Sequence, residues 1–119
     1  MDQPGELSHF IAGQHVPGSS NRFGDVFNPA TGAVSARVPL ATAQEVDRAV
    51  RAAREAFPAW AATPPAQRAR IMFRYRELLE REKDALARIV TSEHGKTLDD
   101  AKGSVLRGLE VVEFVCGIP

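Results

Sequence analysis

Several features that direct proteins toward particular partners are scarce or missing in this sequence. Its 119 residues include one cysteine, Cys116, so no disulfide can form within the chain, as is typical of a reducing compartment. Fifteen basic residues balance fifteen acidic ones, so there is no overall field to attract nucleic acid or an anionic membrane. No apolar run approaches the roughly 20 residues of a membrane span, and the start, MDQPGELSHF, lacks the features of a secretory signal. The sequence predicts a soluble, cytoplasmic protein.

Nucleotide-binding signatures are incomplete. Gly95-Lys96-Thr97 matches the end of a phosphate-binding loop, but the first glycine of that loop falls at Val90, and a G-x-G-x-x-G motif is absent. That first glycine lets backbone N–H groups curl around the phosphates. We therefore interpret the motif as a joint between two helices, in which Gly95 ends one and Thr97 caps the next. Lys96 is expected to complement the C-terminus of the preceding helix.

No catalytic or metal-binding constellation is visible. Cys116 falls on the apolar stripe of a predicted helix, which favours a buried structural thiol. The three histidines, at positions 9, 15 and 94, lack the spacing of metal ligands, and the last is favourable near a helix C-terminus. Acidic residues alternate with the arginines of 68–81, which favours a solvated helix face over a basic patch. The sequence therefore predicts no catalytic, cofactor-binding or metal-binding residue in this chain.

Short β-compatible runs separated by turn formers occupy the first third of the chain. Residues 9–16 predict two short strands around a tight turn at Ala12-Gly13. Residues 28–32, NPATG, predict a second turn between strands, because proline favours the start of such a turn and glycine its end. We assign residues 1–41 to an N-terminal β-hairpin and turn segment.

From residue 42 the apolar spacing becomes that of helices. Thr42 and Glu45 form a capping box at the start of the first helix, which Pro58 is expected to end. Residues 63–65 start a second helix, since proline tolerates the first turn, and the charged run 81–84 predicts a bend or break within it. We interpret the methionine and aromatic positions of the apolar stripes as core. The stripes are Val46, Ala49, Val50, Ala53, Ala56 and Phe57, then Ile71, Met72, Tyr75, Leu78, Leu79, Leu86, Ile89 and Val90.

The third predicted helix, 98–116, is apolar on two sides. One side carries a narrow stripe of Leu98, Ala101, Val105, Leu109, Val112 and Cys116. Val111 and Phe114 lie toward the opposite side, with Gly103 and Arg107. A helix that is apolar on two sides is usually buried on two sides, and each glycine inside it costs about 1 kcal/mol relative to alanine. We therefore expect further polypeptide to cover this helix and the chain to continue beyond Pro119.

Arg107 is the residue with the strongest claim to a binding role. Taken alone, an ion pair with Glu110 one turn later is its simplest interpretation. It projects, however, from the side that is expected to be covered. A partly buried guanidinium favours a carboxylate or phosphate, which its planar fork binds with two hydrogen bonds.

The ordered motifs of this chain resemble the aldehyde dehydrogenase family. FIAGQHV, VFNPATG, the helix ending in AFPAW, RARIMFRYRELLE and the tail from TSEHGKT to CGIP follow one another in the order found in that family. The tail, with RGLEVVEF, resembles the CoA-acylating branch, the methylmalonate-semialdehyde (malonate-semialdehyde) dehydrogenases. The resemblance covers nearly the whole chain, from about residue 9 onward.

This resemblance implies an α/β fold of which the chain is the N-terminal portion, mainly helical after short strands. Residues 42–119 would be the helical part of an incomplete NAD-binding domain, with the catalytic and oligomerisation domains absent. The complete enzyme would be a homo-oligomer, a homotetramer, that oxidises methylmalonate or malonate semialdehyde with NAD and transfers the acyl group to coenzyme A. The nucleophilic cysteine, the oxyanion-hole asparagine and the NAD loop would lie outside this chain, and Cys116 does not match the nucleophile's motif. Arg107 matches an arginine expected to face the substrate carboxylate.

Two other interpretations remain open from the sequence. The complete enzyme could be a non-acylating NAD(P)-dependent aldehyde dehydrogenase, which releases a free acid and is distinguished by an assay with and without coenzyme A. Alternatively, the chain could be a free-standing helical interaction module, which a cooperative melt of the isolated chain would favour.

Overall fold

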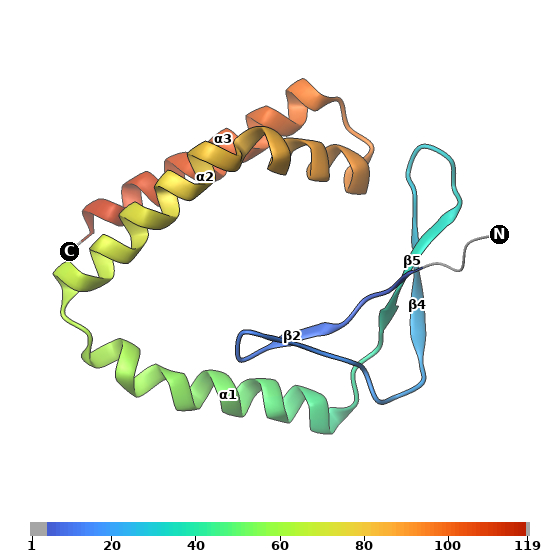
Figure 1. The fold of residues 1–119 in the computed structure, drawn as a ribbon, viewed down its shortest axis with the longest axis horizontal. Coiled ribbons are helices and arrows are strands. Elements are labelled where there is room, and N and C mark those ends of the chain that lie inside the picture. Colours follow the sequence, from blue (N-terminus) through green and yellow to red (C-terminus); the bar gives the residue numbers. More distant parts are fainter. Residues whose placement is uncertain (1–4, 119) are drawn as a thin grey trace. The chain divides into compact units, whose positions relative to one another are not determined.

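The computed structural model describes residues 5–118, in which five short strands precede three helices (Figure 1). This order confirms the predicted fold class, a mainly helical piece that follows short N-terminal strands. The strands are β1 (Gly5–Glu6), β2 (His9–Ile11), β3 (Gln14–Val16), β4 (Phe23–Phe27) and β5 (Val34–Pro39). The helices are α1 (Ala43–Ala62), α2 (Pro65–His94) and α3 (Leu98–Gly117). The chain divides into two compact units, Met1–Ala62 and Thr63–Pro119.

The strands of the first unit form two small sheets. Strands β2 and β3 make the predicted hairpin, with Ala12 and Gly13 in the turn at φ angles of 53° and 77°. Such left-handed angles at both central residues are those of the tight turn that matches strand twist. The second sheet has the order β1-β5-β4, in which β1 is parallel and β4 antiparallel to β5.

The predicted turn between β4 and β5 is confirmed, and Asn28 organises it. The Asn28 Oδ1 atom accepts a hydrogen bond from the Ala30 amide at 2.8 Å. The Asn28 carbonyl accepts another from Gly32, whose φ of 72° is left-handed. A short polar side chain that bonds the backbone two residues later is a common way to start a turn.

Helix α1 begins at the predicted capping box. The Thr42 amide donates to Glu45 Oε2 at 2.7 Å, and the Glu45 amide donates to Thr42 Oγ1 at 3.2 Å. The Ser19 amide adds a bond to Glu45 Oε1 at 2.7 Å, which ties the loop after β3 to the helix start. These donors, the Thr42 amide foremost, lower the pKa of Glu45 from 4.5 to about 2.

The prediction that Pro58 ends the first helix is wrong. Helix α1 continues through Pro58 to Ala62. A proline inside a helix removes one N–H donor and costs about 3 kcal/mol, but the alanine-rich residues 59–62 favour helix and carry it another turn. Phe57 on the apolar stripe of this helix is 66% exposed, so its interpretation as core does not hold within this chain.

The second unit is a pair of helices, α2 and α3, that lie side by side along their length (Figure 1). Gly95 ends α2 with a φ of 81°, and its amide donates to the Thr91 carbonyl, as predicted. Thr97 caps α3 by accepting a hydrogen bond from the Asp100 amide at 3.3 Å. This joint reverses the direction of the chain, so α2 and α3 pack antiparallel.

Small residues form the seam between α2 and α3. The buried apolar positions are Ala87 on α2 and Ala101, Leu109 and Cys116 on α3, so three positions of the predicted α3 stripe are its most buried ones. Alanines lack the bulk to separate two helices, which lets their backbones approach closely. The Arg76 guanidinium also joins the helices, since it donates twice to Glu113 Oε1, at 2.9 Å and 2.7 Å.

The sequence predicts a bend or a break at residues 81–84, and a break is wrong, because α2 runs without interruption from Pro65 to His94. The bend stays a prediction. All four residues of 81–84 are compatible with helix, and their charges remain in solvent. The Lys83 ammonium pairs with Glu80 one turn earlier at 2.6 Å. Tyr75 is 47% exposed, so its interpretation as core is also wrong within this chain.

Large apolar side chains remain exposed on all three helices. They include Val46 and Val50 on α1, Ile71 and Ile89 on α2, and Val111 and Phe114 on α3. Within residues 5–118, no helix has both the length and the apolar character to cross a membrane.

Candidate anion-binding site

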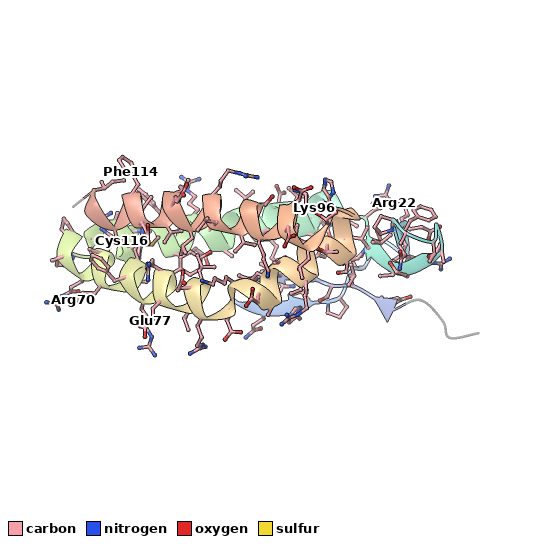
Figure 2. All side chains as sticks on the ribbon, turned by 90° about the horizontal axis from the view of Figure 1, so that it is seen from above. Arg22, Arg70, Glu77, Lys96, Phe114 and Cys116 are labelled. Carbon is pink, nitrogen blue, oxygen red and sulfur yellow. The ribbon has the colours of Figure 1, made fainter. Side chains whose placement is uncertain are left out.

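The candidate site lies on the first three turns of α3 and on the joint before it. Lys96 occupies that joint, and Gly103, Ser104 and Arg107 follow along one side of the helix. Figure 2 shows Lys96 at the end of the helix pair where α2 connects to α3. The turn at Gly95 brings Lys96 alongside the helix that it precedes.

Arg107 does not form the ion pair that the sequence favours. Among residues 5–118, no ion pair joins Arg107 to Glu110. The Arg107 Nη2 atom instead donates to Ser104 Oγ at 3.2 Å. Helical side chains lean toward the N-terminus of their helix, so Arg107 extends back over the preceding turn rather than forward to Glu110.

The Ser104 hydroxyl is shared between two cations. The Lys96 Nζ atom donates to the same oxygen at 2.9 Å, a contact with α3 that the sequence did not predict. The expected complement of Lys96 to the C-terminus of α2 stays a prediction. The hydroxyl itself donates to the Asp100 carbonyl at 3.2 Å. A serine hydroxyl has one donor and two acceptor positions, and this arrangement uses all three.

Gly103 leaves space beside the guanidinium. A Cβ atom at this position would lie 3.6 Å from Arg107 Nη1, an ordinary van der Waals contact. Glycine therefore is not required to avoid a clash in this chain. It leaves the Nη1 side of the guanidinium open to a ligand or to another backbone.

The two cations lack an acidic partner within the described chain. Neither Lys96 nor Arg107 takes part in an ion pair among residues 5–118, although the acidic residues Asp99 and Asp100 occupy the first turn of α3. Lys96 is half-buried, whereas Arg107 is exposed within this chain. Two positive charges held on one neutral oxygen form a site that suits an anion, and carboxylates and phosphates are the groups that guanidinium binds with two parallel bonds.

Apolar side chains continue the same side of α3 toward its C-terminus. Val111 follows Arg107 by one turn and is 63% exposed, and Phe114 follows by two turns and is 73% exposed. Figure 2 shows Phe114 pointing away from α2 and Cys116 lying between the two helices. The cationic end and the apolar end thus share one face, which suits a ligand that carries both a charge and a short apolar part.

The other candidate side chains are not brought together. Cys116 is 6% exposed and has a free thiol, which confirms the prediction of a buried cysteine. His9 lies 3.9 Å from Glu45, and His15 contacts Ser8 at 2.9 Å, whereas His94 ends α2. Within the described residues, no group of three or more metal-ligating side chains could hold a metal ion.

The described residues do not fit a dinucleotide. The groove between Lys83 and Asp84 on α2 and Lys102, Val105 and Leu106 on α3 has a volume of about 170 Å³. A more open hollow along α2, beside Arg70, Phe73 and Arg74, has a volume of about 420 Å³. Neither helix of this unit follows a strand with a glycine-rich turn, the arrangement that receives a pyrophosphate. The described residues thus lack the strand, glycine-rich turn and helix that would hold the pyrophosphate of NAD.

The sequence singled out Arg107 as a candidate but missed Ser104 and the contact of Lys96 with it. The spacing of Ser104 and Arg107, three residues apart on a predicted helix, is a signal that could have joined them. No comparable signal links Lys96 to Ser104, because their contact depends on the path of the joint at Gly95.

A model of the aldehyde dehydrogenase family matches residues 15–119, and this chain belongs to that family. It is 46% identical to the malonate-semialdehyde dehydrogenase of Pseudomonas aeruginosa, over 97% of this chain and 23% of the relative. It is 51% identical to malonate-semialdehyde dehydrogenase 3 of Geobacillus kaustophilus, over 100% of this chain and 25% of the relative. The chain thus spans about a quarter of the length of these relatives.

Solved structures agree with this assignment. A methylmalonate-semialdehyde dehydrogenase from Oceanimonas doudoroffii superposes with a TM-score of 0.91 at 46% identity, over 97% of this chain and 23% of that chain. A Sinorhizobium meliloti protein assigned the same activity, in complex with NAD, gives 0.93 at 49% identity, over 100% of this chain and 24% of that chain. The sequence's resemblance to the aldehyde dehydrogenases is confirmed.

Proposed function

We propose that residues 1–119 act as the N-terminal part of an NAD-dependent, CoA-acylating semialdehyde dehydrogenase. The complete enzyme converts malonate or methylmalonate semialdehyde, NAD and coenzyme A to acetyl-CoA or propionyl-CoA, CO2 and NADH. It is a cytoplasmic homo-oligomer, a homotetramer. The similarity to relatives that bear the names malonate- and methylmalonate-semialdehyde dehydrogenase supports the substrate class.

The chemistry divides between this segment and the remainder of the enzyme. NAD is the hydride acceptor. The nucleophilic cysteine and the oxyanion stabiliser come from outside residues 1–119. The C–C bond to the carboxylate breaks to release CO2, and the carbon left behind takes up the thiol proton of coenzyme A. The task of this segment is to recognise the carboxylate that distinguishes a semialdehyde from an ordinary aldehyde.

Arg107 performs this recognition in the proposal. The observation that carries it is the Arg107 guanidinium, which donates to the neutral Ser104 hydroxyl and has no acidic partner among residues 5–118. The contrast with Arg76 on the neighbouring helix is informative, because Arg76 is paired with Glu113 at 2.7 Å. Arg76 forms its ion pair with a carboxylate of this chain, as is expected of a structural arginine. The guanidinium of Arg107 has N–H donors left to bind the carboxylate of a ligand.

An assay of the complete enzyme tests the proposed reaction. The enzyme is obtained by extending residues 1–119 with the reading frame that follows them or, alternatively, with the remaining three quarters of the Geobacillus kaustophilus relative. With malonate semialdehyde and NAD, we expect acetyl-CoA to form when coenzyme A is present. Chromatography of the products measures it. Release of a free acid at the same rate with and without coenzyme A would instead identify a non-acylating aldehyde dehydrogenase.

A further inference from the structure

We propose that Ser104, together with Lys96, positions Arg107 for the carboxylate, an inference that rests on the proposed function of Arg107. Neither Ser104 nor Lys96 contacts the ligand in this proposal. The pair holds the guanidinium in one orientation before the substrate arrives. Ser104 and Lys96 are therefore positioning residues, and their effect on the enzyme is transmitted through Arg107.

The hydrogen bond to Ser104 uses one edge of the guanidinium and leaves another open. The Nη2 atom is engaged by Ser104 Oγ at 3.2 Å. A Cβ atom at Gly103 would lie 3.6 Å from Nη1, and glycine leaves that position empty. A guanidinium carries five N–H donors in a rigid plane, so fixing one donor of Nη2 orients the whole group and leaves the other four donors, both of Nη1 among them, available for a carboxylate.

Lys96 fixes the direction of the Ser104 hydroxyl. Because both cations are donors, the Ser104 oxygen must accept from each of them, and its proton has to point to another acceptor. The Asp100 carbonyl, 3.2 Å away and one turn earlier on the helix, is that acceptor. Without the bond from Lys96 Nζ at 2.9 Å, the hydroxyl could rotate and its lone pair would no longer be directed at Arg107.

Pre-orientation has a definite kinetic signature. An arginine side chain has many accessible rotamers, and its ordering on binding weakens affinity. If Ser104 orders the Arg107 side chain before the substrate binds, loss of Ser104 weakens substrate binding. The chemical step is less affected, because other residues carry it out. An aldehyde without a carboxylate does not use Arg107 and is insensitive to the change.

The test uses Ser104→Ala in the complete enzyme, with malonate semialdehyde and propanal as paired substrates. We expect KM for malonate semialdehyde to rise about tenfold, because a hydrogen bond to a charged group is lost, while kcat stays within about twofold and kcat/KM for propanal is unchanged. Ser104→Thr keeps the hydroxyl and should restore a near-normal KM. Ser92→Ala is the matched control, since the Ser92 hydroxyl also donates to a helix carbonyl, that of Ile89 at 2.8 Å, but lies on α2.

Lys96→Met tests the second half of the proposal. It removes the ammonium but keeps the length of the side chain, and we expect KM for malonate semialdehyde to rise by about the same factor as in Ser104→Ala. Lys102→Met is the control, because Lys102 is an exposed α3 lysine that faces Asp84 at 3.7 Å. Ser104→Ala added to Arg107→Leu should have no further effect, since residues that act through one another are not additive.

The outcomes separate this inference from the proposed function. If Arg107→Leu impairs malonate semialdehyde selectively but Ser104→Ala leaves its KM unchanged, the positioning role is overturned and the function of Arg107 stands. If Arg107→Leu impairs both substrates equally, the proposed function fails first. Equal losses on both substrates in Ser104→Ala would show a structural role and would also overturn the inference.

Discussion

At the scale of single residues, the hydrogen-bond partner of an arginine indicates whether it has a structural role or can bind a ligand. Arg76 and Arg107 lie on neighbouring helices and carry the same charge. Arg76 is neutralised by Glu113 across the helix seam, whereas Arg107 contacts only the neutral Ser104 hydroxyl among the partners that the structure describes. A guanidinium on a neutral partner keeps its charge available for a ligand.

Removal of this guanidinium should change substrate selection. In the complete enzyme, we expect Arg107→Leu to lower kcat/KM for malonate semialdehyde about 100-fold, because a site built to bind a polar group discriminates strongly through it. The same variant should lower kcat/KM for propanal less than about threefold. Steady-state kinetics with both aldehydes measure the ratio. Arg70→Leu, an exposed arginine of α2 (Figure 2), is the control that should change neither value.

At the scale of elements, the capping box shows how one side chain joins two segments. Glu45 accepts hydrogen bonds from Thr42 at the start of α1 and from Ser19 in the loop after β3. The charged carboxylate is the form that accepts these bonds, which is why its pKa falls to about 2. The start of α1 is therefore tied to the β-segment only while Glu45 is ionised.

This linkage predicts a pH dependence for the first unit. A carboxyl whose pKa is lowered on folding contributes stability that is present above its ordinary value of 4.5 and is lost as the pH falls toward 2. We expect the free energy of unfolding to decrease between about pH 5 and pH 2 in the wild-type sequence, measured by urea titration of the complete enzyme. Glu45→Gln should be less stable at pH 7 and should show a smaller decrease. An identical slope in both proteins would contradict this role of Glu45.

At the scale of the whole molecule, the described residues leave many large apolar side chains exposed. Their buried apolar positions are Ala87, Ala101, Leu109 and Cys116, while aromatic residues on every helix are exposed. Apolar patches of this extent usually mark surfaces that another polypeptide covers. The chain's match to about a quarter of its relatives' length accords with this view.

The isolated 119-residue chain should therefore not behave as an independent domain. We expect a broad thermal transition, binding of a hydrophobic dye and concentration-dependent association, because the exposed faces of α1 and α3 have no cover. Circular dichroism and light scattering measure these properties. Co-expression with the remaining three quarters of the Geobacillus kaustophilus relative should yield a soluble complex. A sharp cooperative melt of a monomer would instead favour a free-standing interaction module.

The elements were predictable because their signals are local. The capping box at Thr42, the turn at Ala12-Gly13 and the helix end at Gly95 each depend on a few neighbouring residues, and all three are confirmed. The predicted effect of Pro58 is wrong because helix propensity in the following residues outweighed one local rule. The assignment of residues 1–41 and 42–119 to separate segments stays a prediction.

The sequence by itself determined the order of strands and helices and the family, because each depends on neighbouring residues or on motifs read in order. It also singled out Arg107, whose role stays a prediction. Only the tertiary structure decided that Arg107 contacts Ser104 rather than Glu110, and that Lys96 shares the same oxygen. The physical reason is that a side chain's partner depends on its direction along the helix and on the path of the joint at Gly95. Spacing along the chain specifies neither of these.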